Sequence, residues 1–202
     1  MYVPPRFRPE KDALRAFVRA AEFGLLLSNG EGGGAPRGTH LPLMVEERNG
    51  ALSIACHLAR GNPQWQALEG QEVLLVLQGP GAYVSPAWYD TPDVPTWNYL
   101  SAHVQARVTQ MGDNDFRAHL IALVERHEQR RRDGVDPGQW DEGFIEQQMR
   151  GAVGLRLAVT RLEGAFKLSQ NKTDAERERV AEGLASEGGA AGQALARRMK
   201  DD

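Results

Sequence analysis

Four short segments of this 202-residue chain combine hydrogen-bond donors with apolar or aromatic anchors. They are residues 39–42, 57–63, 95–99 and 167–171. A phosphorylated cofactor requires cationic and hydroxyl donors at one end and an apolar or aromatic slot at the other. The four segments supply this mixture, so we take them as the candidate binding site, although their spacing alone does not identify the ligand.

Arg60 is the candidate contact to an anion within the second segment. It comes just before Asn62-Pro63, a pair that predicts a helix start because Asn caps free backbone amides and Pro suits the first helical position. A guanidinium and free amides would converge there, which suits a phosphate. The alternative, a solvated loop arginine, remains open at this stage.

His40 and His57 are predicted to lie on strands beside these donors. Taken by itself, each is more simply a hydrogen-bonded strand histidine than a ligand contact. A metal or haem site built with His103 is a third interpretation, but the spacing of the three histidines matches no zinc signature. We therefore expect no metal site.

Three of the four tryptophans lie in or near the polar segments, namely Trp65, Trp88 and Trp97. Their ordinary place would be the core or a subunit interface, where one end of the side chain is apolar and the other is polar. Only Trp97, which is followed by Asn98 and Tyr99, is assigned to the ligand site.

Lys167, Ser169 and Gln170 follow the last predicted strand. They could contact a ligand, or they could form a structural turn that satisfies backbone groups. Cys56 is interpreted as a small buried apolar residue rather than a nucleophile, because only the adjacent His57 could lower the pKa of its thiol.

Alternating apolar residues separated by turn signals predict an antiparallel β-barrel. The predicted strands are residues 23–28, 37–45, 51–57, 72–78, 82–86, 96–108 and 153–163. Asn49-Gly50 favours a tight hairpin, Pro42 an edge or bulged position, and residues 79–81 a turn between two strands.

Apolar residues at three- and four-residue spacing predict helices on several segments between and after these strands. The predicted helices are residues 9–21, 62–70, 113–132, 141–149 and 173–185. A capping box of Thr173 and Glu176 begins the last of them. Residues 186–192 are expected to break that helix, and one further helix is expected from Gln193. The three arginines at 130–132 are interpreted as a solvated helix end.

The composition is that of an ordinary globular protein with a formal net charge of -3. A DNA-binding surface usually carries a basic surplus, so direct DNA binding is not favoured. The single cysteine, the N-terminus without a signal-peptide pattern and the lack of a long apolar run predict a cytoplasmic protein without a membrane segment.

Six separated motifs occur in an order and spacing that resemble the PaiB-type family of FMN-binding negative transcriptional regulators. They are MYVPP (1–5), THLPL (39–43), HLARGNPQW (57–65), YVSPAWY (83–89), VPTWNY (94–99) and KLSQN (167–171). The chain departs from the family pattern in a shortened loop at residues 89–94 that lacks a common lysine, and in Gly61, where Ala or another small residue is usual. The resemblance covers residues 1–185 as one domain, and it fades over the Gly/Ala-rich segment at 186–202, for which a short C-terminal helix is expected.

The resemblance implies an FMN-binding split β-barrel, akin to pyridoxamine-phosphate oxidases, that binds FMN at a homodimer interface. The implied cofactor contacts are Thr39, His40, His57, Arg60, Asn62, Trp97, Asn98, Tyr99, Lys167, Ser169 and Gln170. It also implies a role as a negative regulator with a transcriptional partner or DNA. A flavin-dependent oxidoreductase is the alternative, because the same fold supports redox chemistry by the cofactor. No acid/base pair in the sequence decides between them, so whether the chain is an enzyme stays open.

Overall fold

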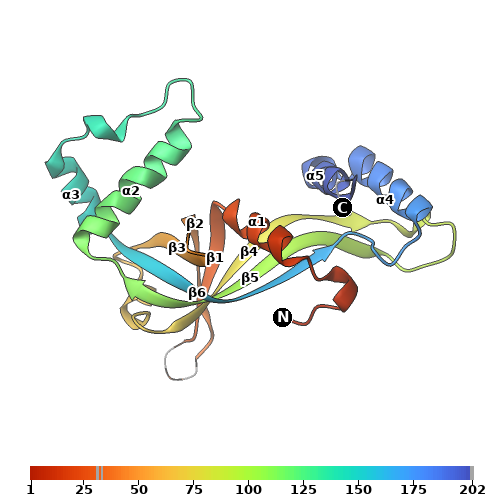
Figure 1. Cartoon of the computed structure of the whole chain (residues 1–202), viewed down its shortest axis with the longest axis horizontal. Coiled ribbons are helices and arrows are strands. Elements are labelled where there is room, and N and C mark those ends of the chain that lie inside the picture. The colour runs from red at the N-terminus through yellow and green to blue at the C-terminus, as the bar shows by residue number, and fades with distance from the viewer. Residues whose placement is uncertain (31, 33, 201–202) are drawn as a thin grey trace. The chain divides into compact units, whose positions relative to one another are not determined.

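The computed structural model describes residues 1–30, 32 and 34–200. The predicted antiparallel barrel is present, with strands in the order β1-β2-β3-β6-β5-β4 (Figure 1). The strands are β1 (Phe23–Ser28), β2 (Arg37–Arg48), β3 (Ala51–Ala59), β4 (Glu72–Val84), β5 (Thr96–Gln110) and β6 (Ala152–Lys167). The α-helices are α1 (Lys11–Arg19), α2 (Asp113–Glu128), α3 (Glu142–Gly151), α4 (Asp174–Glu187) and α5 (Gly189–Lys200).

The chain divides into two compact units, which we describe separately. The barrel unit comprises Ala16–Leu77 and Val104–Leu162, and the terminal unit comprises Met1–Arg15, Gln78–His103 and Glu163–Asp202. Strands β4, β5 and β6 each contribute residues to both units.

The hairpin of β2 and β3 shows how local sequence sets the register. Asn49 and Gly50 have φ values of 52° and 78°, the positive values that a two-residue hairpin turn of the predicted type requires. Residues before Leu43 pair with β1, whereas Leu43 and the residues after it pair with β3. Pro42 lies at this change of partner, and it has a registered partner only in β1. This one-sided pairing explains how a residue without an amide hydrogen is accommodated in the barrel.

The predicted turn at residues 79–81 is wrong, because β4 continues without a break from Glu72 to Val84. The registered pairing of β4 with β1 covers only Leu74–Val76. Pro80 therefore lies beyond the residues that β1 pairs, so its missing amide donor removes no hydrogen bond to β1.

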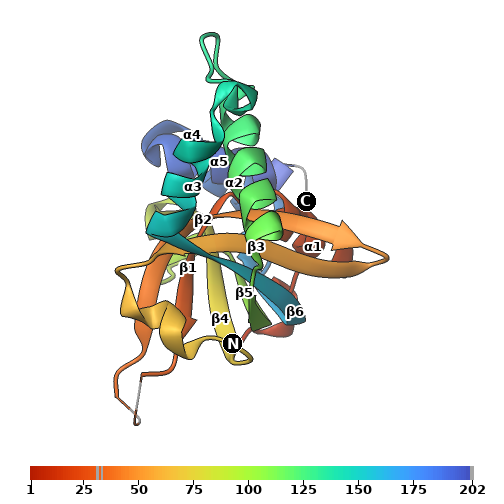
Figure 2. The same ribbon diagram turned by 90° about the vertical axis from the view of Figure 1, so that its left-hand side faces the viewer.

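In the barrel unit, α2 and α3 lie side by side and connect β5 to β6 (Figure 2). Phe116 of α2 packs against Gly154 of β6 so closely that a Cβ on this glycine would lie 2.5 Å from the ring. Helix α2 ends at Glu128 rather than at residue 132. Arg130 is not simply solvated, because it forms an ion pair with Glu22 at 2.6 Å.

In the terminal unit, α4 and α5 pack against each other (Figure 1). The predicted capping box is present at the start of α4, with Thr173 and Glu176 bonding each other's backbone amides. The break between the two helices is only Gly188, shorter than the predicted break at 186–192, and α5 begins at Gly189 instead of Gln193. Within the part of the chain that the structure describes, we find no helix with the length and apolar character needed to span a membrane.

Candidate functional site

Thr39 and Asn62 belong to a hydrogen-bond network that links β2 to the turn after β3. Thr39 Oγ1 donates to Gln64 Oε1 at 2.6 Å and accepts from Asn62 Nδ2 at 2.8 Å. Asn62 Oδ1 caps the following 3-10 helix by accepting from the Gln64 amide at 3.0 Å. The Gln64 side chain, which is buried, donates to Ser28 Oγ and to the carbonyl of Arg37. The network fixes the turn that carries Arg60. Gln64 takes part in most of its hydrogen bonds, and the sequence analysis did not identify this residue.

Arg60 is exposed but held in place by backbone acceptors. Its Nε donates to the carbonyl of Arg150 at 2.9 Å, and its Nη2 donates to the carbonyl of Ala152 at 3.0 Å. The guanidinium carbon lies 5.8 Å from the ring centroid of Trp65, whose indole nitrogen in turn donates to the carbonyl of Arg60. These contacts orient the cation without neutralising its charge.

The cleft around Arg60 has a volume of about 540 Å³ and is lined by residues from α2, α3 and the start of β6. Two other arginines line it, and each has a carboxylate partner: Arg117 pairs with Glu142, and Arg150 pairs with Glu146 at 3.7 Å. Arg60 has no carboxylate partner within the described residues. Its charge is therefore the one in this cleft that is available to a bound anion.

His57 lies beside a second histidine that the sequence interpretation did not connect with it. His57 Nδ1 is 3.2 Å from His119 Nε2, so one nitrogen donates and the other accepts. Burial lowers the pKa of His57, and burial together with the charge of His57 lowers the pKa of His119 to about 4. The pair is neutral near pH 7. No sequence signal joined these residues, because they lie on β3 and α2.

The other histidine of the prediction, His40, is exposed on β2 and stacks on Phe23 with ring centroids 6.1 Å apart. Cys56 is fully buried, and burial raises the pKa of its thiol to about 12, which agrees with a small apolar core residue. The described part of the chain contains no group of three or more His, Cys, Asp or Glu side chains that could hold a metal ion.

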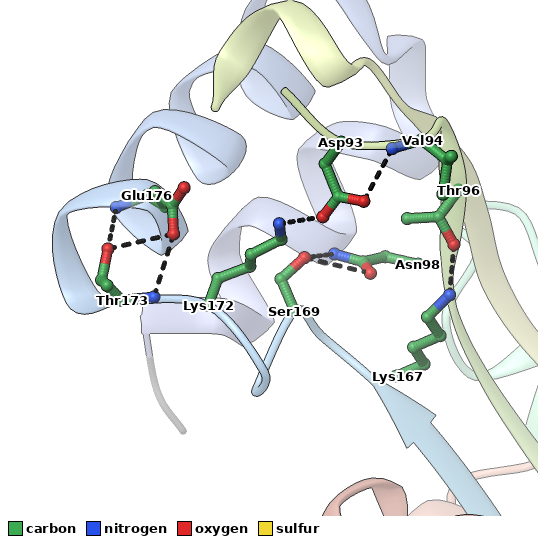
Figure 3. Close-up of polar contacts among 9 residues, drawn as sticks. All are labelled: Asp93, Val94, Thr96, Asn98, Lys167, Ser169, Lys172, Thr173 and Glu176. Carbon is green, nitrogen blue, oxygen red and sulfur yellow. Dashed lines mark hydrogen bonds and ion pairs between the residues drawn. The ribbon is translucent and has the colours of Figure 1, made fainter. Parts of the chain in front are cut away.

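In the terminal unit, Asn98 and Ser169 form a buried pair. Asn98 Nδ2 donates to Ser169 Oγ at 2.9 Å (Figure 3). It also lies 3.7 Å from Met199 Sδ of α5. Asn98 is 0% exposed and Ser169 is 2% exposed. Ser169 also has a φ of 61°, an uncommon value for a residue with a side chain. The pair fixes the chain just after β6.

Lys167 and Gln170 lie on either side of that position. Lys167 Nζ donates to Thr96 Oγ1, as Figure 3 shows, and burial lowers the pKa of this lysine. The Gln170 side chain accepts from the amide of Leu168 at 2.8 Å and donates to the carbonyl of Phe166 at 2.6 Å. Gln170 thus closes the turn, whereas Lys167 is directed toward the N-terminal end of β5.

Trp97 and Tyr99 alternate with the buried Asn98 along β5, so they lie on the opposite face of the strand. Trp97 is 57% exposed and packs edge-on against Tyr83 of β4, with ring centroids 6.3 Å apart. Together, the exposed side chains of Tyr83, Trp97 and Tyr99 form what we call the aromatic face of the terminal unit.

The predicted site residues thus fall into two groups. The barrel unit contains Thr39, His40, His57, Arg60 and Asn62, and the terminal unit contains Trp97, Asn98, Tyr99, Lys167, Ser169 and Gln170. Within each group the structure brings some members together: Thr39 with Asn62, and Asn98 with Ser169. Their roles as cofactor contacts remain predictions.

The sequence profile of a family described as "Putative FMN-binding domain" matches residues 1–161. The chain is 32% identical to "Protease synthase and sporulation protein PAI 2" of Bacillus subtilis, over 100% of this chain and 97% of that protein. It is also 27% identical to an uncharacterised protein of Aspergillus fumigatus, over 93% of this chain and 92% of the relative.

Two solved structures share the fold at low sequence identity. The FAD and haem binding protein of Mycobacterium smegmatis is 15% identical, with a TM-score of 0.58 over 83% of this chain and 76% of the other. A protein of Bacteroides thetaiotaomicron described as a "putative 5-nitroimidazole antibiotic resistance protein" is 12% identical, with a TM-score of 0.54 over 77% of this chain and 82% of the other. These similarities confirm the predicted fold class.

Proposed function

Because the chain belongs to the family of FMN-binding domains, as its motifs predicted, we propose that it is a negative transcriptional regulator that acts as an FMN-bound homodimer. The observation that carries the proposal is the 32% identity to the PAI 2 protein over the whole chain, since the name of that relative refers to a protease synthase and to sporulation. Regulation of gene expression is a natural basis for such a name. The flavin would serve as the signal that changes the state of the dimer.

The FMN phosphate is proposed to bind at Arg60 in the cleft of the barrel unit. The guanidinium is oriented by two carbonyls and lacks a carboxylate partner among the described residues. A charge-assisted hydrogen bond to phosphate uses such a pre-oriented cation well, because little side-chain freedom is lost on binding. The cleft volume of about 540 Å³ lies within the usual range for small-molecule sites.

The aromatic face supports the proposed homodimer. Three neighbouring aromatic side chains that are 39–57% exposed are unusual for a free surface, since exposed clusters of this kind mark interfaces or ligand sites. A second copy of the chain would cover this face.

Bound FMN would supply redox chemistry in either function, so the chain's own residues must decide between regulator and oxidoreductase. The pair of His57 and His119 is the candidate that we consider for proton transfer in the barrel unit. However, burial lowers the pKa of His119 to about 4, so it would be a poor proton donor near pH 7.

The test compares catalysis with transcription. We expect FMN-loaded protein to oxidise NADH or NADPH no faster than free FMN does, and to bind DNA weakly with strong dependence on salt. We also expect deletion of the gene to raise specific transcripts, which the wild-type gene lowers again and an Arg60→Ala gene does not. Rapid steady-state NAD(P)H oxidation with unchanged transcripts would instead identify a flavin-dependent oxidoreductase.

A further inference from the structure

A second cavity, of about 360 Å³, lies entirely within the terminal unit. Its wall is formed by the N-terminal segment, the loop before β5 and the end of β6. Three cations line it, Arg6, Lys167 and Lys172, but only one carboxylate does, that of Asp93. Hydroxyl and aromatic side chains make up much of the remainder.

The single carboxylate, that of Asp93, already has a cationic partner. Asp93 forms an ion pair with Lys172, which raises the pKa of Lys172 and lowers that of Asp93 (Figure 3). Lys172 Nζ also lies 3.7 Å from the ring centroid of Tyr89. This side of the cavity is therefore electrically balanced.

On the side of the cavity next to Phe7, positive charge has no negative partner within the described part of the chain. Lys167 Nζ lies 5.8 Å from the ring centroid of Phe7, and the guanidinium carbon of Arg6 lies 6.0 Å from the same centroid. Lys167 has only the hydroxyl of Thr96 as a hydrogen-bond partner, and neither cation has a carboxylate partner among the residues that the structure describes. Burial lowers the pKa of Lys167, so its charged form lacks solvation that a bound anion could replace.

The walls of the cavity are held in place by contacts remote from these charges. The N-terminal ammonium of Met1 pairs with Glu163 at 2.8 Å, and Arg8 Nε donates to the carbonyl of Val3 at 3.1 Å. Ser169, which also lines the cavity, has a positive φ and accepts a hydrogen bond from the buried Asn98 side chain. Strained backbone of this kind is found where a site must be held in a fixed geometry.

We propose that this cavity binds a small aromatic ligand through its phosphate or carboxylate group, which is held by Lys167 and Arg6. The anion compensates the two unpaired charges, Thr96 donates or accepts a further hydrogen bond, and Phe7 and Tyr89 supply contacts to the ring. The anionic group belongs either to FMN itself or to a second ligand. The site does not depend on the proposed role of Arg60, because it is built from other residues.

The test uses titration calorimetry of the apo protein with benzoate and phenyl phosphate, and with benzamide as the uncharged analogue. We expect both anions to bind and benzamide to bind at least about tenfold more weakly, because it lacks the charge. Lys167→Met and Arg6→Met should each weaken the anions by roughly ten- to a hundredfold. Lys167→Arg should retain binding, and Lys11→Met, which removes an exposed cation outside the cavity, should leave it unchanged.

A further arm identifies the source of the anion. If a second ligand uses the site, benzoate binds FMN-loaded protein as well as it binds the apo protein. If FMN uses it, FMN competes with benzoate, and Lys167→Met weakens FMN but not riboflavin. Either result supports the anion site, and neither requires Arg60 to bind phosphate. The proposal is overturned if the anions bind no better than benzamide, or if they bind folded Lys167→Met and Arg6→Met proteins as tightly as the wild type.

Discussion

Arg60 has two sets of contacts that a substitution would separate. Its hydrogen bonds to the carbonyls of Arg150 and Ala152 are structural, and its unpaired charge is the proposed contact to phosphate. We predict that Arg60→Ala lowers FMN affinity roughly ten- to a hundredfold and leaves riboflavin affinity nearly unchanged, because riboflavin has no phosphate. The lost carbonyl contacts should also lower the free energy of unfolding by about 1 kcal/mol.

Calorimetric titration with both flavins and urea unfolding of the apo protein measure these two effects. Arg60→Lys is the matched control, since it retains the charge but not the planar donor pair, and it should recover part of the FMN affinity. An equal loss of affinity for FMN and riboflavin would show that Arg60 acts only by shaping the cleft.

The pair of His57 and His119 predicts a pH dependence of stability. Burial lowers both pKa values in the folded protein, that of His119 to about 4, whereas unfolded histidine titrates near 6.5. Between these values the unfolded chain binds more protons, so the free energy of unfolding should fall as the pH falls from about 6.5 to about 4. Above that range the contribution is fully present.

His119→Phe should make this pH dependence shallower, because it removes one of the two groups. The replacement is apolar, and His119 Nδ1 has no hydrogen-bond partner within the described chain, so that nitrogen loses no contact. Urea unfolding at pH 7, 6 and 5 provides the comparison. Parallel pH profiles for the wild type and the variant would contradict the assignment.

Residue types near the site could be predicted from the sequence where the contacts are local. The cap of Asn62 on the following helix and the capping box of Thr173 and Glu176 were both expected and are present. The neighbour of His57, which is His119, and the ring shared by Arg6 and Lys167 were not expected. Each joins segments far apart in the chain, and single-residue patterns contain no information about such pairs.

For the strands, too, the sequence predicted the features that depend on neighbouring residues and missed those that depend on distant ones. Strand β1 and the Asn49-Gly50 hairpin agree with the prediction, because alternation and turn chemistry are local properties. The division of β4 at residues 79–81 was wrong, since Gly and Pro usually end a strand. Gly and Pro can lie inside a strand where the edge at which they stand has no hydrogen-bonded neighbour. The sequence of the strand does not show which edge that is, because it depends on the assembled sheet.

In helix α4, a substitution at Gly183 can show whether side-chain packing or helix propensity has the larger effect on stability. Gly183 lies inside this helix, where Ala would ordinarily stabilise by about 0.5–1 kcal/mol. A Cβ at this position would lie 2.3 Å from the ring of Trp88. We therefore predict that Gly183→Ala lowers the free energy of unfolding, by about 1–3 kcal/mol, because the overpacking outweighs the helix preference.

Chemical denaturation of both proteins measures the sign directly. Gly61→Ala is the control, since a Cβ there meets no atom within 4 Å, and it should change stability by less than about 0.5 kcal/mol. A stabilised Gly183→Ala protein would mean that Trp88 does not pack against α4 as described.

For the whole molecule, the aromatic face predicts self-association. We expect a homodimer, with twice the chain mass of 22.3 kDa, in light scattering at micromolar concentration. Trp97→Glu should shift the mass toward the monomer, because it places a charge on a surface that the partner covers. Phe144→Glu changes another exposed aromatic residue, on α3, and should leave the mass unchanged. A wild-type mass of 22.3 kDa would rule out the dimer at that concentration.

The central claim concerns the whole chain as a flavin protein with a site for a phosphate, and titration of apo protein with FMN and riboflavin tests it most directly. We predict that FMN binds at least about tenfold more tightly than riboflavin, because a charge-assisted contact to phosphate is available to FMN alone. The preference should decrease as salt concentration rises. Equal affinity for the two flavins, or no binding of FMN to folded protein, would contradict the account.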